Sequence, residues 1–191
     1  MSKYSDFPRH NHDLYPTPLP PVLSLRKAMG DVKFKYWEPC CADGQLVKHI
    51  DHLFPKATCV AQSDLETSVG GTRDLFSITH EEADELDINY FITNPPWMNK
   101  PSSGYQLFRL INHLASIRPT ILLLNANICW NKGSWTNKLA PMPFCQWIKP
   151  TARIKWIPES AYAGKEDCAW FCFNKTSPLA NMSGPVILPR D

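Results

Sequence analysis

The sequence predicts an α/β fold built on a mostly parallel sheet. Short apolar runs of strand character alternate with amphipathic segments through the first two-thirds of the chain. Acidic or amide side chains directly follow several of the apolar runs, which is typical of ligand-binding loops beyond the carboxyl ends of parallel strands. The 191 residues, 43% of them hydrophobic, suffice for one domain with a sizeable core.

Each element follows from composition and periodicity. Apolar runs predict strands at 34–37, 57–61, 90–93, 120–125, 152–157 and 169–173, with a short strand or turn at 74–76. Helical spacing of apolar residues predicts helices at 22–29, 45–54, 81–86 and 105–117. Gly30 and Pro119 end the first and last of these helices. Such alternation places helices on both faces of the sheet.

The two ends of the chain are rich in proline and differ from the middle. We therefore expect an extended N-terminal arm over 1–21, a single domain over 22–175, and a disordered tail over 176–191. The N-terminus lacks the apolar core of a signal peptide, and no apolar run is long enough to span a bilayer. We expect a cytoplasmic protein without a membrane partner.

The net charge and the cysteine content exclude few functional classes of protein. The net charge is +2, from 20 basic and 18 acidic residues, so a nucleic-acid-binding surface would have to be local. The seven cysteines are odd in number, lie in apolar runs and show no Cys-x-x-Cys spacing. This pattern indicates reduced thiols and no metal site.

The most specific motif is Asn94-Pro95-Pro96-Trp97, which directly follows a buried strand. Proline fixes its own φ and restricts the preceding residue, so this loop is predicted to be rigid. It presents two acceptors, the Asn94 side-chain oxygen and the Pro95 carbonyl, beside the flat Trp97 indole. The simpler alternative is a proline turn that only ends a strand.

This loop resembles motif IV, the (Asn/Asp/Ser)-Pro-Pro-(Tyr/Phe/Trp) loop of S-adenosylmethionine-dependent amino-methyltransferases, especially the DNA N6-adenine methyltransferases. Residues 36–46 read YWEPCCADGQL and resemble motif I of that family, and Tyr15-Pro16-Thr17-Pro18 resembles motif X. The similarity covers residues 14–173 and matches the layout of many phage-encoded adenine methyltransferases. It implies a Rossmann-like methyltransferase fold with a seven-stranded sheet, and S-adenosyl-L-methionine as cofactor.

The chemistry of amino methylation fits the loop. An exocyclic amine is a poor nucleophile because its lone pair is delocalised into the ring. Acceptors on its two N–H bonds favour pyramidal geometry and stabilise the developing positive charge. The resemblance therefore implies that Asn94, Pro95, Pro96 and Trp97 are catalytic, with Trp97 also stacking on the base.

Motif I implies how the cofactor is held. Small residues let backbone N–H groups approach its methionine part, and Glu38 can hold its ammonium group. As an alternative, Glu38 only caps the following helix. Ala42 departs from the family, which usually has a glycine there, and alanine does not easily adopt a positive φ. The cofactor-binding residues implied by the resemblance are Tyr15, Thr17, Glu38, Pro39, Cys40, Ala42, Gly44, Asp64, Asp74 and Leu75.

Two of these residues follow the next strands. Asp64 is placed to accept from the ribose hydroxyls, as the motif II acid. Glu66 competes for this role, and a turn-forming Asp is the alternative. Asp74-Leu75 resembles motif III, whose Asp accepts from the cofactor's adenine amine while the next residue packs on its ring.

The late part of the chain offers weaker candidates. Tyr162 is expected to stack on the target base, with Trp156 as an alternative that alternation makes equally suited to the core. Arg153, Lys155 and Lys165 either contact phosphates or form a solvated face. Tryptophans and lysines interleave over 127–143, which suits either a nucleic-acid channel or a surface loop.

The resemblance implies methyl transfer to the N6 amine of adenine in DNA, with the base flipped out of the duplex. No separate target-recognition segment follows the late strands, so specificity is expected to be loose or to come from loops or a second subunit. Three alternatives stay open: adenine methylation of RNA, glutamine methylation of protein, and an inactive cofactor-binding partner subunit. Trp97 in place of tyrosine favours nucleic acid, whereas Ala42 would fit an inactive partner.

Overall fold

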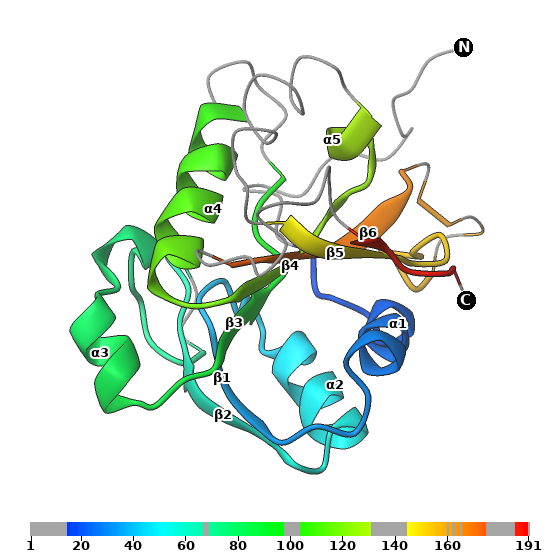
Figure 1. Cartoon of the computed structure of the whole chain (residues 1–191). Helices are drawn as coiled ribbons and strands as arrows, with labels where there is room; N and C mark the ends of the chain where they lie inside the picture. The colour runs from blue at the N-terminus through cyan, green and yellow to red at the C-terminus, as the bar shows by residue number, and fades with distance from the viewer. Residues whose placement is uncertain are drawn as a thin grey trace.

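A seven-stranded sheet forms the centre of the molecule, with strand order β2-β1-β3-β4-β6-β5-β7 (Figure 1). The computed structural model describes residues 15–66, 69–97, 104–130, 145–159, 161, 163–164, 166–174 and 186–190. The strands are β1 Phe34–Glu38, β2 Ala57–Gln62, β3 Tyr90–Thr93, β4 Thr120–Asn125, β5 Cys145–Pro150, β6 Cys168–Phe173 and β7 Val186–Ile187. The helices are α1 Leu19–Met29, α2 Gln45–Leu53, the 3₁₀ helix η2 Leu75–Ser77, α3 His80–Glu85, α4 Gly104–Ile117 and α5 Asn127–Trp130.

The sheet is parallel except at one strand. β1 pairs in parallel with β2 and β3, β3 with β4, and β5 with β7. β6 runs antiparallel to both of its neighbours, β4 and β5. The predicted mostly parallel seven-stranded α/β fold is confirmed.

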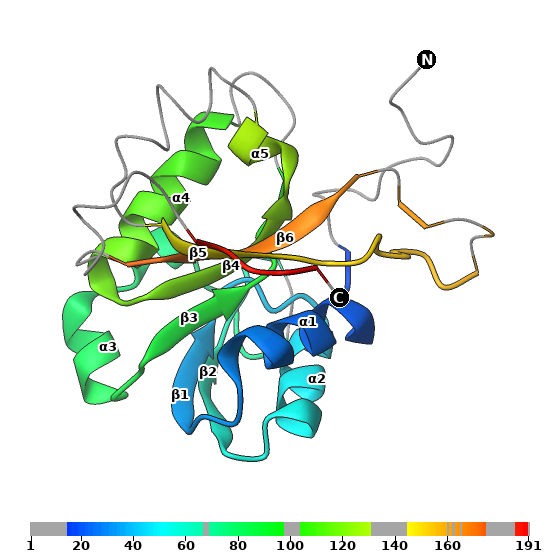
Figure 2. The same cartoon turned by 45° about the vertical axis from the view of Figure 1, so that its right-hand side comes forward.

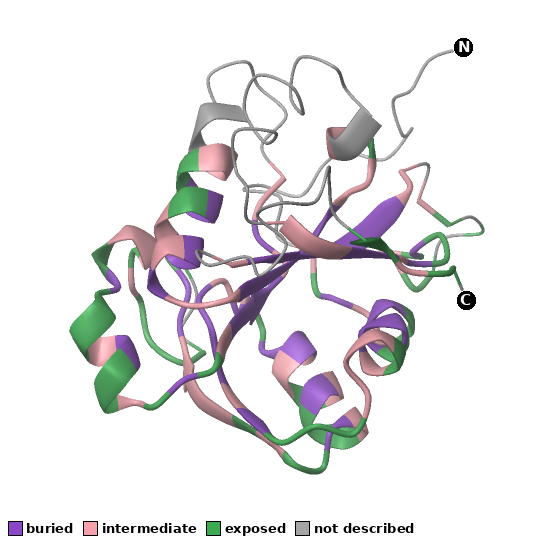
Figure 3. Ribbon diagram, viewed as in Figure 1, coloured by how far each residue is buried: buried purple, intermediate pink, exposed green. Residues whose placement is uncertain are grey.

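Helices cover both faces of this sheet, as predicted (Figure 2). On one face α1 and α2 pack through Val22, Leu25, Leu46 and Ile50. On the other face, α3 and α4 bury Ala83 and side chains such as Leu110, Ile111 and Leu114. All six residues of β6 and the first five of β4 are buried, which matches their continuous apolar sequence (Figure 3).

One predicted strand is wrong. Residues 152–157 form no strand, and the strand that pairs with β6 is β5, at Cys145–Pro150. The side chains of this segment do alternate between buried and exposed, which is why the sequence predicted a strand. Ile154 is buried and Trp156 is half-buried, whereas Arg153 and Lys155 are exposed. The segment nevertheless pairs with no neighbouring strand. This segment is instead held by a bond from the Gly164 N–H to the Ile154 carbonyl, at 2.7 Å.

Both ends also differ from expectation where the structure describes them. Helix α1 begins at Leu19 because Pro20 and Pro21 lie in its first turn, where a missing N–H costs nothing. At the other end Val186 and Ile187 form β7 instead of a disordered tail, since these apolar residues extend the sheet beside β5. The Leu188 N–H donates to the Ile148 carbonyl at 2.8 Å. The rest of the expected arm and tail lies outside the described residues.

Within the described ranges, no helix is both long and apolar enough to cross a membrane. The same residues contain no group of three His, Cys, Asp or Glu side chains arranged to hold a metal ion. Six cysteines are free thiols: Cys40, Cys41, Cys59, Cys145, Cys168 and Cys172.

Candidate functional site

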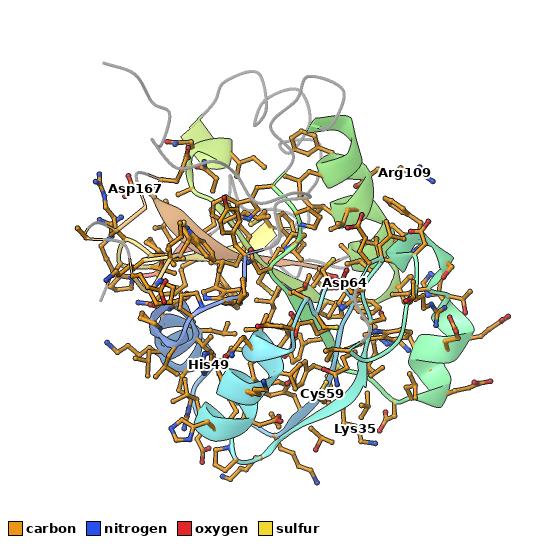
Figure 4. The ribbon with its side chains drawn as sticks, turned by 180° about the vertical axis from the view of Figure 1, so that it is seen from behind. Lys35, His49, Cys59, Asp64, Arg109 and Asp167 are labelled. Atoms are coloured by element: carbon orange, nitrogen blue, oxygen red, sulfur yellow. The ribbon has the colours of Figure 1, made fainter. Side chains whose placement is uncertain are left out.

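The carboxyl ends of β1, β2 and β3 gather the candidate residues at one edge of the sheet. Glu38 is the last residue of β1, Asp64 lies just beyond β2, and Asn94 directly follows β3. The Ser63 N–H donates to the Glu38 carbonyl at 2.9 Å and joins the first two loops. In Figure 4 Asp64 lies deep among the side chains, while Lys35, near the start of β1, lies toward the opposite end of the sheet.

Glu38 is a buried carboxyl group with an unpartnered oxygen. Its side chain is 1% exposed, and Oε2 has no hydrogen-bond partner among the described residues. Burial, and then the nearby carboxylates of Asp64 and Asp43, raise the pKa of Glu38 well above its usual range. A buried acceptor without a partner fits a cationic ligand group such as an ammonium.

The motif I loop is bonded to the loop that follows β2. The Cys41 N–H donates to the Ser63 carbonyl at 2.9 Å, and the Cys41 thiol donates to the Val69 carbonyl at 3.0 Å. The Ala42 N–H donates to Asp64 Oδ2 at 2.9 Å. Several N–H groups of this loop are thus engaged within the protein.

Two residues of this loop have left-handed backbone conformations. Ala42 has φ +47° and Gly44 has φ +77°. At Gly44 an added Cβ would also lie 3.3 Å from Val69, so both the conformation and the space favour glycine. Ala42 therefore adopts the conformation for which the family usually uses glycine, although alanine is strained there.

Asp64 is better placed than Glu66 to act as the motif II acid. Asp64 is 9% exposed, and its Oδ1 accepts from the Glu66 N–H at 3.1 Å, whereas Glu66 is exposed. The chain returns beside Asp64, whose N–H donates to the Gly71 carbonyl at 3.2 Å and whose carbonyl accepts from the Arg73 N–H at 2.7 Å. Asp64 thus connects motif I with the segment that leads into motif III.

The motif III pair lies at the start of η2. Asp74 is exposed, and its Oδ1 accepts from the Phe76 N–H at 2.9 Å, so the side chain caps the 3₁₀ helix. Leu75 is half-buried and packs against the core between the sheet and α4. The Arg73–Asp64 bond places this pair next to the motif II loop.

Asn94 is half-buried, and its Nδ2 donates to the Tyr15 carbonyl at 3.3 Å. This bond brings the motif X segment, in which Thr17 is buried, against the motif IV loop. Pro95 is buried and Pro96 is half-buried. The amide is therefore fixed with its nitrogen toward Tyr15, and its oxygen is the atom that can accept a further N–H.

Cys40 links this loop to the acids of the first two strands. Burial, and then the Asp64 carboxylate, raise the pKa of the Cys40 thiol, and the Thr93 hydroxyl lies beside it. Thr93 ends β3 directly before Asn94. The Cys40 side chain thus lies near both Asp64 and the residue that precedes Asn94. Pro39, also in motif I, is buried.

Three aromatic side chains surround the Asn94 loop. The Trp97 indole donates to the Leu123 carbonyl at 3.0 Å, and the Trp97 and Trp156 rings meet edge to face with centroids 5.3 Å apart. Trp156 also contacts Tyr15, at 6.1 Å between centroids. Trp156, only the alternative on sequence, is thus the aromatic beside motif IV. The first choice, Tyr162, lies outside the described residues, as do Lys165 and most of 127–143.

Basic side chains flank Trp156. Arg153 and Lys155 are exposed on the same segment, and Arg153 Nε lies 3.6 Å from Asp167 Oδ1. Arg190 lies 3.8 Å from the same carboxylate oxygen. This exposed basic segment lies where β5 ends and β6 begins, because the two strands are antiparallel.

Two cavities lie outside the Asn94 loop. One of about 420 Å³ is lined by residues that include Trp37, Ser63, Gly71 and Arg73. It adjoins the motif II loop, because the Trp37 indole donates to the Ser63 hydroxyl at 3.1 Å. The other, of about 490 Å³, lies between α1 and β7. Neither lining, among the described residues, contains Glu38 or Asn94.

The fold has clear counterparts among solved structures, whereas the sequence has none: no known family profile and no curated protein matches the chain. A Listeria monocytogenes protein assigned to the class I S-adenosylmethionine-dependent methyltransferases matches with TM-score 0.57 and 13% identity, over 97% of this chain and 68% of its own. The type I restriction–modification methyltransferase subunit of Streptococcus thermophilus matches with TM-score 0.56 and 10% identity, over 86% and 46%.

A modification subunit assigned to a type I restriction enzyme of Vibrio vulnificus matches with TM-score 0.55 and 14% identity, over 86% of this chain and 45% of its own. The chain thus spans less than half the length of either restriction–modification subunit. At such low identities the likeness concerns the fold. The chain has the fold of class I S-adenosylmethionine-dependent methyltransferases.

Proposed function

We propose that the protein transfers a methyl group from S-adenosylmethionine to the N6 amine of adenine in DNA. The observation that carries this proposal is the oriented Asn94 amide at the end of β3, beside the Trp97–Trp156 pair. The adjacent strand, β1, ends at Glu38, whose buried Oε2 has no partner among the described residues. A rigid acceptor, an aromatic surface and an anionic group for a cofactor then share one edge of the sheet.

The cofactor-binding residues have distinct tasks in this proposal. Glu38 binds the ammonium of the methionine part, because its buried Oε2 lacks another partner. Asp64 has lone pairs left on its carboxylate for the ribose hydroxyls. Asp74 and Leu75 approach the adenine ring. When bound, S-adenosylmethionine supplies an electrophilic methyl group on a sulfonium.

The Asn94 loop acts on the amine. Asn94 Oδ1 and the Pro95 carbonyl accept from its two N–H bonds, which orients the nitrogen lone pair toward the methyl carbon. The nitrogen–carbon bond forms as the sulfur–carbon bond breaks, and one N–H proton leaves to water. The Tyr15 bond to Nδ2 keeps the acceptor oxygen in place throughout.

Nucleic acid is favoured over protein as substrate. The Trp97 and Trp156 rings offer apolar surface for a planar base, and Arg153 and Lys155 lie on the exposed side of the same segment, where phosphates could bind. Two of the similar structures are subunits of type I restriction–modification enzymes. Because both of these structures are named as subunits of larger enzymes, sequence recognition by a second subunit is part of the proposal.

Labelled S-adenosylmethionine tests the proposal. The protein is incubated with adenine-containing duplex DNA, single-stranded RNA of the same sequence, or a mixture of polypeptides, and label is traced to the modified group. We expect label on adenine N6 of DNA. Label only in RNA or in glutamine would overturn the substrate assignment, and cofactor binding without transfer to any substrate would indicate an inactive partner.

Asn94→Ala completes the design. We expect loss of transfer by about 10²-fold or more, the scale of removing one preorganised hydrogen-bonding group, with cofactor binding retained. Asn112→Ala, a change of the same side chain at an exposed position on α4, is the matched control and should leave transfer intact.

A further inference from the structure

The strained Ala42 backbone and the Asp64 carboxylate are joined by a single hydrogen bond. Ala42 has φ +47°, and its N–H donates to Asp64 Oδ2 at 2.9 Å. We propose that Asp64 is a positioning residue whose carboxylate holds the motif I loop in a glycine-like conformation despite the alanine. We call the hydrogen bond from Ala42 to Asp64 the strut. Its role in cofactor binding rests on the proposed function.

A strained backbone conformation at a non-glycine residue persists only when the contacts around that residue hold it in place. Alanine in the left-handed region brings its Cβ close to the following carbonyl oxygen. A loop without support would relax to negative φ and turn the Ala42 N–H away. The 2.9 Å bond to a carboxylate opposes this relaxation, and a bond to a charged acceptor is stronger than one to a neutral acceptor.

Asp64 is built to act as such a support. It is 9% exposed, and a second bond, from the Glu66 N–H to Oδ1 at 3.1 Å, fixes the other carboxylate oxygen. Its own backbone is held on both sides, by the bonds to Gly71 and Arg73. The carboxylate is therefore anchored independently of Ala42.

The neighbouring bonds of the loop do not replace this one. The Cys41 N–H and thiol bond to the Ser63 and Val69 carbonyls, and the Gly44 N–H bonds to the Cys41 carbonyl. The bond between Gly44 and Cys41 closes a turn around Ala42 and Asp43. Such a turn forms with either sign of φ at its first central residue, so these bonds do not by themselves select the positive φ of Ala42. Asp64 would thus serve the cofactor site through the loop, whether or not it also contacts the ribose.

A stability cycle on the cofactor-free protein tests the strut directly. Ala42→Gly removes the strain, so the loop needs less support. We expect Asp64→Ala to lower Tm by several degrees in the natural background and by clearly less in the Ala42→Gly background. Asp31→Ala is the control, because the Asp31 carboxylate pairs with Arg26 and Lys56 and lies before β1, at the opposite end of that strand from Ala42. Its effect should be equal in both backgrounds.

Binding of two ligands separates the strut from a ribose contact. S-adenosylhomocysteine and its 2′,3′-dideoxy analogue, which lacks the ribose hydroxyls, are titrated by calorimetry. We expect Asp64→Ala to weaken binding of the dideoxy analogue by about tenfold, the effect of one hydrogen bond to a charged group, and Ala42→Gly to restore most of this loss. The loss for S-adenosylhomocysteine should be larger, because a ribose contact by Asp64 disappears as well. Asp64→Asn, which keeps one acceptor oxygen, should fall between and provides a variant that folds.

The outcomes are distinguishable. Equal effects of Asp64→Ala in the two backgrounds would overturn the strut. A binding loss confined to the ribose-containing ligand would assign Asp64 to the ribose alone and overturn it too. If neither the natural protein nor any variant binds either ligand, the proposed function fails. The stability cycle still decides whether Asp64 supports Ala42.

Discussion

Asn94 Nδ2 donates to the backbone carbonyl of Tyr15 at 3.3 Å, across 79 positions of sequence. The bond determines which end of the amide points toward Tyr15 and therefore which end can accept from a substrate. Because the acceptor is a backbone carbonyl, position 94 needs a side chain that donates as well as accepts.

Asn94→Asp tests this requirement. The related loops tolerate Asp, but here a carboxylate would face the Tyr15 carbonyl without a proton to share. We expect methyl transfer to fall by about 10²-fold and the amides of Thr17 and Leu19 to exchange faster, as measured by hydrogen exchange. Asn112→Asp on α4 is the control. Wild-type activity with unchanged protection would show that the bond has no role.

Glu38→Gln should stabilise the cofactor-free protein at neutral pH. The pKa of Glu38 is raised in the folded state, so the folded protein binds this proton more strongly than the unfolded chain does. Stability then falls as pH rises from the unfolded value, about 4.3, to the raised folded value, by about 1.4 kcal/mol for each pKa unit between them. Glutamine avoids this loss.

Urea unfolding at several pH values measures the effect. The gain from Glu38→Gln should be present at pH 7 and should vanish near pH 4, where the carboxyl is protonated in both states. Glu85→Gln, at an exposed position on α3, is the comparison. A variant that is less stable than the natural protein at pH 7 would contradict a costly buried carboxyl group.

Cofactor binding should release a proton from the same group. An ammonium placed at Glu38 favours the ionised form, so binding below the raised pKa expels the proton. The binding enthalpy of S-adenosylhomocysteine should therefore depend on the ionisation enthalpy of the buffer. Glu38→Gln should bind more weakly and show no such dependence. A buffer-independent enthalpy for the natural protein would mean that Glu38 is already charged or does not hold the ammonium.

The sequence predicted the centre of the sheet well because its strands are continuous apolar runs. β3, β4 and β6 lie within a residue of their predicted positions, since burial on both faces leaves no room for polar residues. β5 was missed because Cys145–Pro150 mixes polar and apolar residues, and the alternation of 152–157 imitated a strand. Its pairing depends on β6, which is distant in sequence.

The candidate site was predictable at its strand ends but not in its contacts. Glu38, Asp64 and Asn94 follow parallel strands, so their gathering at one edge follows from topology. The Ala42–Asp64 bond and the Trp97–Trp156 contact could not be read from the sequence, because both join segments through loop geometry. The close approach of Gly70 to Gln62, at the end of β2, is another contact that depends on how the loop folds back.

Trp97→Phe should destabilise the protein modestly. Phenylalanine keeps the apolar ring but leaves the Leu123 carbonyl without the indole donor, which costs about 0.5–1.5 kcal/mol. Chemical denaturation with an unchanged m-value would measure this loss. Trp147→Phe, at a half-buried position in β5, gives the cost of the ring change alone. Equal losses in the two variants would show that the bond to Leu123 contributes nothing.

Gly70→Ala and Gly71→Ala form a matched pair that separates backbone strain from contact. Both glycines have positive φ, +75° and +97°, so either alanine costs about 1–2 kcal/mol in conformation. At Gly70, an added Cβ would lie 2.4 Å from the Gln62 carbonyl oxygen, whereas at Gly71 it meets nothing within 4 Å. We therefore expect Gly70→Ala to cost a further 1–3 kcal/mol or so in urea unfolding.

The same pair probes the site. Backbone cannot yield as a flexible side chain does, so Gly70→Ala must displace the turn from Gln62, and with it the Gly71 carbonyl that accepts from the Asp64 N–H at 3.2 Å. Affinity for S-adenosylhomocysteine should fall with Gly70→Ala and change little with Gly71→Ala. Equal losses of stability and affinity in both variants would mean that the turn tolerates the Cβ, and that the position of Asp64 does not depend on this close approach.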